Sequence, residues 1–346
     1  MKNFNMKCSL LTLLLMSSVL LKSQTTSPAL AYMEEMSFLS SELKDETWQY
    51  LKAVTKGKSA RKVEKKRIEL INKVGAKKRE ISAKRKFTED GSYKKAVENY
   101  LQMTYTVLKE DYDKILDMED IAEQSYDLME AYILAKELAN EKLEGAFDEL
   151  KAAQEEFAAA NNINLVEGEM DKKSLKIESA NEALGYYNDV YLIFFKSYKQ
   201  EAYIQDAFSR ADVNAMEQNI NTMLTFNEEG LSKLDELDNY NGDAALKLAV
   251  KKILRYFDEE AKVHYPSMVN FFVAKDNFEK ATAIIESKKK SKRTQDDIDN
   301  YNTAVKTFNN EVKAYNATTQ LTNNERSKLL EGWNKEVDAF FKRQTN

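Results

Sequence analysis

The stretch KGKSARKVEKKRIELINKVGAKKREISAKRK, residues 56–86, is strongly basic and predicts a long helix. It holds fourteen Lys and Arg against three Glu, a balance of +11, whereas the whole chain carries −5. Its apolar residues lie at helical spacing on one narrow stripe: Ala60, Val63, Leu70, Val74 and Ile81. The segment therefore predicts an amphipathic helix with a very basic outer face, which needs an anionic partner inside or outside the protein.

Both kinds of partner fit the sequence. Segment 110–156 carries sixteen acids and four lysines, a balance of −12, so an antiparallel neighbour helix could neutralise the basic face. An external partner is the alternative: an anionic one, such as lipid headgroups, lipopolysaccharide, acidic glycans or extracellular DNA, or another surface protein. The candidate residues of that patch are Lys58, Arg61, Lys62, Lys65, Lys66, Lys77, Lys78 and Arg79. Nucleic acid is not expected, because no aromatic residue between Tyr50 and Phe87 can stack on bases.

The composition favours helices throughout the chain. The 346 residues are 43% hydrophobic and 32% charged, as in a folded protein, but include nine Gly and two Pro. An all-β protein of this length would need many more turn residues. We predict an all-α fold of about eight or nine helices in one or two elongated antiparallel bundles, with two duplicated four-helix-like halves as one form of it.

Apolar periodicity and capping residues place the helices. They are expected at 29–55, 56–86, 92–117, 119–160, 172–209, 213–237 and from 244 onward, then after the cap Thr294 and after the capping box of Thr322 and Glu325. Asp212 can cap the helix that follows it, and Pro266 should kink or end its helix. The polar break at 161–168 predicts a boundary between an N-terminal half, 32–161, and a C-terminal half, 169–346.

An internal duplication is suggested at an offset of 153 residues. At this offset Leu101 falls on Leu254 and Tyr112 falls on Tyr265, and Val97 falls on Val250 in the same way. Two amphipathic helices match apolar positions easily, so the pattern suggests a repeat and does not establish one.

The N-terminus predicts a secretory signal peptide. Lys2 and Lys7 precede an apolar run at 8–21 that is short for a membrane span, and cleavage could follow Ser23 or, later, Ala31. The alternative is a retained anchor helix. Cys8 opens the apolar run and is badly placed for lipid attachment, so a lipoprotein is not expected. We expect a soluble protein of the periplasm, the cell surface or the medium, with no transmembrane segment after cleavage.

Two segments of the sequence carry a family resemblance. GKSARKVEKKRIELI (57–71) and GSYKKAVENYLQMTYTVLKEDYDKILDMEDIAEQSYDLMEAY (91–132), with Trp48 and Tyr50 before them, resemble a family of secreted helical surface proteins found in Bacteroidota and Leptospira. The likeness is best over about 45–145. It implies a helical cell-envelope or surface protein without an assigned activity, so it supplies no functional residues.

Catalytic signatures are missing from the sequence. His264 is the single histidine; Glu260 lies one turn before it, and the pair could bind a metal weakly, although a surface or partly buried histidine explains it as well. Di-iron bundles need two Glu-x-x-His motifs, and Gly57-Lys58-Ser59 lacks the earlier Gly of a phosphate loop. We therefore expect no enzyme, no cofactor and no metal.

An aromatic cluster near the middle of the chain has two interpretations. Aromatic residues at helical spacing are usually core, and the alternative is a tyrosine-lined groove formed by Tyr187, Tyr191, Phe194 and Tyr198. The leading hypothesis for function is a non-catalytic envelope or surface protein that acts by binding or as a structural element. The alternative is a periplasmic carrier or chaperone-like module that holds an apolar ligand in that groove.

Overall fold

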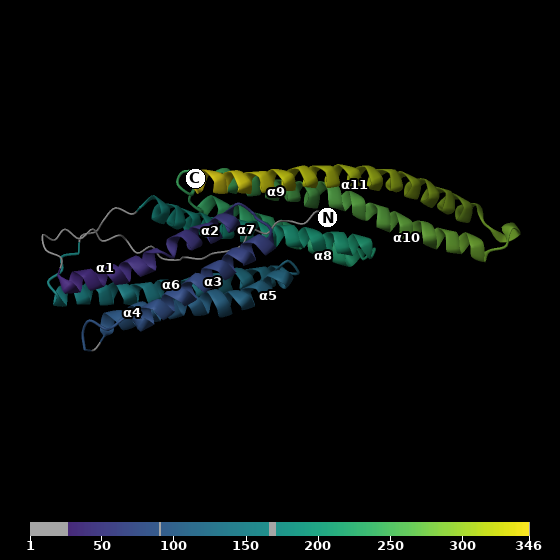
Figure 1. Ribbon diagram of the computed structural model, residues 1–346. Coiled ribbons are helices and arrows are strands. Elements are labelled where there is room, and N and C mark those ends of the chain that lie inside the picture. The colour runs from purple at the N-terminus through teal and green to yellow at the C-terminus, as the bar shows by residue number, and fades with distance from the viewer. Residues whose placement is uncertain (1–26, 90, 166–170, 346) are drawn as a thin grey trace. The chain divides into compact units, whose positions relative to one another are not determined.

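The computed structural model describes residues 27–89, 91–165 and 171–345. In these ranges the chain forms nine continuous helical segments and no strand, and Figure 1 shows them as coiled ribbons. The predicted all-α fold of eight or nine helices is confirmed. The predicted signal peptide, residues 1–23, lies outside the described residues.

The N-terminal segment forms two helices in place of one. α1 (Pro28–Ser41) and α2 (Lys44–Thr55) replace the single helix predicted at 29–55, with the break at residues 42 and 43. The basic helix α3 (Ala60–Ala83) follows and packs against α2. The basic stretch is therefore helical, as predicted.

The next helix contains a π turn, a stretch with i→i+5 hydrogen bonds. α4 (Ser92–Thr106), η1 (Val107–Asp111) and α5 (Tyr112–Ala122) run without interruption, and α6 (Tyr126–Ala160) packs against both α4 and α5. The break before α6 lies later than the predicted 118, because Ser125 caps α6 by accepting a hydrogen bond from the Leu128 N–H at 3.2 Å.

The second half of the chain follows the predicted order of helices. The elements are α7 (Lys172–Ser209), α8 (Val213–Glu236), α9 (Ala245–Glu259), the π turn η2 (Glu260–His264), α10 (Tyr265–Ser287), the 3₁₀ turn η3 (Lys290–Lys292) and α11 (Gln295–Gln344). Both predicted caps are present. Asp212 accepts from the Ala215 N–H (3.0 Å), and Thr294 accepts from the Asp297 N–H (3.2 Å).

The structure differs from two expected helix boundaries. Of the two alternatives at Pro266, a kink or an end, the end is wrong: α9, η2 and α10 run without interruption, and Pro266 lies in the first turn of α10 directly after η2, where a missing N–H is tolerated. No helix starts at Thr322, since this residue lies inside α11, a helix of 50 residues. The buried Thr322 hydroxyl donates to the Thr319 carbonyl (3.2 Å), as threonine does inside helices, whereas a capping threonine accepts from a backbone N–H.

The chain forms two compact units that do not divide at the predicted boundary. One contains the residues up to Asp189 together with 338–346, and the other is Val190–Val337. The division falls inside α7, because this helix contributes side chains to both cores. Tyr187 contacts Phe341 in the first unit (5.4 Å between ring centroids), and Phe194 contacts Trp333 in the second (5.4 Å).

The bounds of the helices support the predicted duplication. α3 and α8 both have 24 residues and α4 and α9 both have 15, and each pair begins and ends at the offset of 153. The π turns η1 and η2, and the first residues of α5 and α10, keep the same offset. Because π turns are rare, their recurrence at matched positions argues for a repeated unit of structure.

Candidate functional site

The basic residues of α3 divide into an exposed and an enclosed group. The side chains of Lys58, Arg61, Lys62, Lys65 and Arg79 are exposed, and those of Lys66 and Lys78 are partly buried. Lys77 is buried and forms ion pairs with Glu42 and with Glu80 (2.9 Å). The predicted patch therefore loses Lys77, whose charge is already neutralised inside the protein.

Acids of α3 itself and of the preceding segment neutralise part of its charge. Arg67 pairs with Glu64 at 2.8 Å, and Lys84 pairs with Glu35 of α1. Arg67 also lies 3.6 Å from Asp113, a pair that joins the two oppositely charged segments as predicted. The acids of α6, however, lie on a helix that packs against α4 and α5, whereas α3 packs against α1, α2, α4 and η1.

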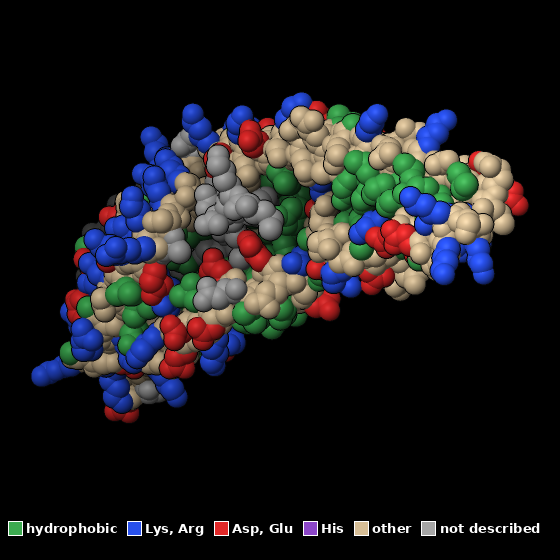
Figure 2. Space-filling view, turned by 90° about the vertical axis from the view of Figure 1, so that its right-hand side faces the viewer, with side chains coloured by type: hydrophobic (Ala, Val, Ile, Leu, Met, Phe, Trp, Pro, Cys, Tyr) green, Lys and Arg blue, Asp and Glu red, His purple; other side chains and the backbone are tan. Residues whose placement is uncertain are grey.

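The start of α3 and the two residues before it carry a concentration of positive charge that we call the basic helix end: Lys58, Arg61, Lys62 and Lys65. The first turn of α3 contains no acid, and the Lys65 ammonium group, whose side chain is 75% exposed, lies 3.9 Å from the Glu69 carboxylate. A helix N-terminus carries a partial positive charge, which disfavours cations in the first turn, here Arg61 and Lys62, by about 0.3–1 kcal/mol each. The stability of the helix therefore does not explain these two residues. Figure 2 shows Lys and Arg side chains projecting from much of one face of the protein, with Asp and Glu among them in places.

The aromatic cluster lies in the core. Tyr187, Tyr191 and Phe194 are at most 1% exposed, and Tyr198 stacks on Phe194 at 5.4 Å between centroids. In the second unit, the Trp333 ring covers Phe194. Tyr187, Tyr191 and Phe194 are therefore core residues, as the first interpretation expects, whereas Tyr198 is partly exposed.

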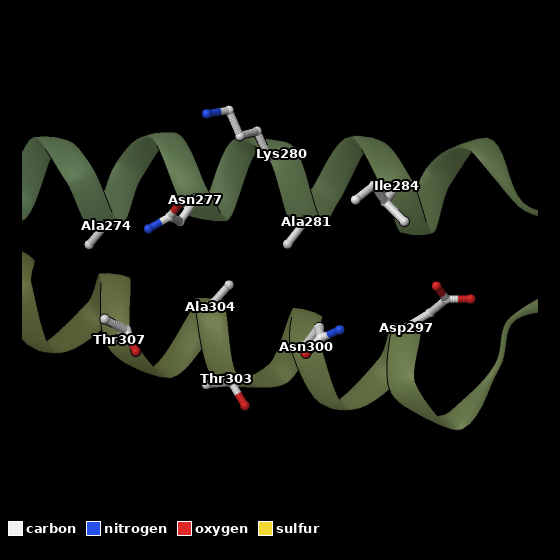
Figure 3. A pocket seen from close by; sticks show the side chains of 10 residues that line it. All are labelled: Ala274, Asn277, Lys280, Ala281, Ile284, Asp297, Asn300, Thr303, Ala304 and Thr307. Carbon is white, nitrogen blue, oxygen red and sulfur yellow. The ribbon is translucent and has the colours of Figure 1, made fainter.

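A shallow groove of about 410 Å³ lies between α10 and α11 in the second unit. Figure 3 shows Ala274, Ala281 and Ala304 pointing into the space between the helices, while Lys280 points away from it. At one end, Asp297 is engaged by Lys288 (2.6 Å) and by the N-terminus of α11. The rest of the lining is amide, hydroxyl and methyl groups, which can bind another surface but offer no acid–base pair.

The second unit also encloses an ion cluster, which we define as Glu201, Glu260, Tyr265 and Arg326. Arg326 pairs with Glu201, and its Nε lies 3.2 Å from Glu260 Oε1. The Tyr265 hydroxyl is within hydrogen-bonding distance of Glu201 (3.3 Å) and of Glu260 (3.4 Å), and it accepts from the Gln205 side chain (3.3 Å). Four helical elements, α7, η2, α10 and α11, thus meet at one polar point in the core.

Burial shifts the ionisation of this cluster. Glu260 is 0% exposed, and burial raises its pKa from 4.5 to about 8. Burial lowers the pKa of Arg326 to about 10 and raises that of Tyr265 well above its ordinary value. One guanidinium faces two carboxylates, so the cluster is closest to neutral when one carboxyl keeps its proton, and the wholly enclosed Glu260 is the one favoured to do so.

The hypothesis of a Glu260–His264 metal pair is not supported by the geometry. Glu260 points into the ion cluster, whereas the His264 ring lies 3.6 Å from Glu259. Across the part of the chain that the structure describes, no group of three or more His, Cys, Asp or Glu is arranged to hold a metal ion.

Sequence reasoning missed Glu201 and Arg326 and considered Glu260 only beside the histidine. One signal was present in the repeat, because Glu260 falls on Val107 at the offset of 153, and Val107 is a core position. A Glu in place of a core Val indicates a buried charge. Arg326 gave no such signal, since α11 has no counterpart of matching bounds in the first repeat.

Comparisons of the chain with protein-family models, with curated proteins and with solved structures find no match. The resemblance to secreted surface proteins therefore stays a prediction. Among the described helices, none is both long and apolar enough to cross a bilayer.

Proposed function

We propose that this is a non-catalytic cell-envelope or surface protein that binds an anionic envelope component through the basic helix end. The observation that carries the proposal is the exposure of Lys58, Arg61, Lys62 and Lys65 at a helix N-terminus without an acid in its first turn. Such an arrangement costs stability in the free protein, and an anionic surface would offset that cost.

Export of the protein is part of this proposal. The residues before 27 have the pattern of a signal peptide, and α1 depends on residues close to the two cleavage points. Ala29 and Leu30 are each 5% exposed, so cleavage after Ala31 would remove two core residues, whereas cleavage after Ser23 would leave α1 complete. We therefore propose cleavage after Ser23, which N-terminal sequencing of the protein from its native cell would test.

Binding to vesicles tests the function directly. The chain without residues 1–23 should sediment with vesicles that contain phosphatidylglycerol and not with vesicles of phosphatidylcholine alone. Retention should weaken as salt rises, because the screening length falls to about 10 Å at 0.1 M. The variant with Lys58, Arg61, Lys62 and Lys65 all replaced by Gln should lose retention and keep its circular dichroism spectrum.

A matched variant removes the same charge elsewhere. Lys289, Lys290, Lys292 and Lys313 are also exposed, and replacing these four by Gln should leave retention unchanged. Equal loss of retention in both variants would show that total charge, not the basic helix end, drives binding. Retention of the first variant at the level of the unaltered protein would refute the proposal.

A further inference from the structure

We propose that the ion cluster of the second unit is a proton-binding switch, in which release of a proton from Glu260 loosens the contact of η2 with α7 and α11. This inference is independent of the proposed binding function. It rests on the enclosed geometry of the cluster and on a comparison between the two repeats.

The repeats provide an internal comparison. The first repeat builds the same π turn around Val107, which is 0% exposed, where the second has Glu260, also 0% exposed. In the same way, Met103 stands at the position of Tyr256, while Tyr112 and Tyr265 are alike and both buried. The fold therefore forms without the buried carboxyl, and an ion pair is often a costlier solution than apolar packing. The charge in the second repeat needs an explanation other than folding.

Charged and titratable groups of several neighbouring elements face Glu260 or the side chains that contact it. They are Glu201 on α7, Tyr256 and Glu259 on α9, Tyr265 on α10, and Glu325 and Arg326 on α11. The buried side chains of α8 that belong to this core, such as Met223 and Asn227, are uncharged. With both carboxyls ionised, the cluster carries one uncompensated negative charge in the interior, which one bound proton removes.

The direction of the pH effect follows from linkage. The pKa of Glu260 is about 8 in the folded unit and 4.5 in the unfolded chain. Between pH 4.5 and about 8, the folded state therefore holds a proton that the unfolded state has released. The second unit is then most stable at acidic pH and loses stability as pH rises towards about 8. One proton of difference changes the unfolding constant by up to roughly tenfold for each pH unit. Arg326, with a pKa of about 10, stays charged across this window.

Fluorescence can report on the second unit alone. The chain has two Trp, of which Trp333 is buried against Phe194 in this unit, so Trp48→Phe leaves a single reporter. Urea unfolding of this parent at pH values from about 5 to 8.5 should show a midpoint that falls as pH rises. Adding Glu260→Gln should remove most of that fall, because the amide is neutral at every pH and keeps the size of the protonated acid.

Two matched variants exclude other titrations. Glu259→Gln makes the same charge change at a neighbour whose side chain is 59% exposed. In this variant the urea midpoint should still fall as pH rises. Histidine titrates in the same range, so His264→Gln is the second control and should keep the fall as well. The switch would be refuted if the urea midpoint of the Trp48→Phe parent did not fall as pH rises. It would also be refuted if the midpoint of the Glu260→Gln variant fell as much as that of the parent.

A second measurement covers the case in which Glu260→Gln does not fold. Carbon-13 NMR of glutamate carboxyls in the unaltered protein should show one Glu that titrates near pH 8, apart from the others. If every glutamate titrates below about pH 6, Glu260 does not hold the proton and the proposal fails.

Discussion

The ammonium group of Lys94 donates a hydrogen bond to the carbonyl oxygen of Lys84, at 2.6 Å. Lys84 is the C-cap residue of α3, so a side chain from the next helix satisfies a carbonyl at the helix end. The second repeat does the same 153 residues later, where Lys247 donates to the carbonyl of Leu237, the C-cap residue of α8. The duplication thus extends from element bounds to a specific polar contact.

This contact should stabilise both repeats. Replacing Lys94 or Lys247 by Met keeps the apolar stem but leaves the carbonyl without its charged donor, so each change should lower the free energy of unfolding by about 1–2 kcal/mol. Urea titration measures the effect. The exposed neighbours Lys95 and Lys252 provide controls, since Met at either should change stability by less than about 0.5 kcal/mol. Equal effects at contact and control positions would show that the bonds contribute nothing.

Gly230 permits a close approach of α8 to its neighbours. A methyl group at this position would lie 2.9 Å from Leu254 Cδ1 and 3.2 Å from Ile193 Cγ2. Gly230→Ala should therefore destabilise the second unit by about 1–3 kcal/mol, as overpacked cores do. Gly332, in α11, has nothing within 4 Å of the added methyl, so Gly332→Ala should be neutral or stabilising by up to about 1 kcal/mol. In thermal unfolding, Gly230→Ala should lower the midpoint temperature, and Gly332→Ala should leave it unchanged or raise it.

Lys77 should behave as a structural residue and not as part of a binding patch. Its side chain is 11% exposed and lies between two acids, Glu42 and Glu80. Lys77→Met should lower the free energy of unfolding by about 1–3 kcal/mol and leave vesicle retention unchanged once the protein is folded. The exposed Arg79 lies two residues along the same helix, and Arg79→Met should leave stability within about 0.5 kcal/mol. Loss of retention without loss of stability in Lys77→Met would contradict this assignment.

Local sequence signals predicted most of the helices. Asp212 and Thr294 cap their helices as expected because an N-cap bond involves residues three apart in the chain. The same kind of signal failed at Thr322, since a Thr-x-x-Glu pattern inside α11 makes a bond back to Thr319 instead. Whether such a threonine starts a helix depends on how the residues around it pack. The spacing of apolar residues along the sequence does not show this packing.

The site was harder to predict than the fold. Periodicity placed Tyr191 and Phe194 on one helix face but could not show that neighbouring rings cover them. The pairing of Glu201 with Arg326 joins residues 125 positions apart, and their meeting depends on how α7 and α11 pack. The opposite net charges of 56–86 and 110–156 suggested that these two segments pair mainly with each other. Many basic side chains of α3, however, form ion pairs with Glu35, with Glu42 and with acids of α3 itself.

The start of α7 should lose support in acid. Asp171 accepts from Lys44 (2.7 Å) and from the Ser174 N–H (3.0 Å), and chiefly the Lys44 bond lowers its pKa from 3.8 to about 2. A lowered folded-state pKa means that the carboxylate stabilises the fold above about 3.8 and that this contribution disappears as pH falls towards 2.

Asp171→Asn keeps a capping oxygen but loses the charge that faces Lys44. Because the Asp171 side chain is 47% exposed, the variant should be less stable than the unaltered protein by no more than about 1 kcal/mol at neutral pH. Urea midpoints measured at pH values of about 6, 4, 3 and 2 should show this difference shrinking below pH 4. Asp127, an exposed acid in the first turn of α6, provides the matched control, and Asn there should give a smaller difference at neutral pH. A difference that persists unchanged at pH 2 would show that the amide disturbs the cap itself, and that the charge on Asp171 is not the cause.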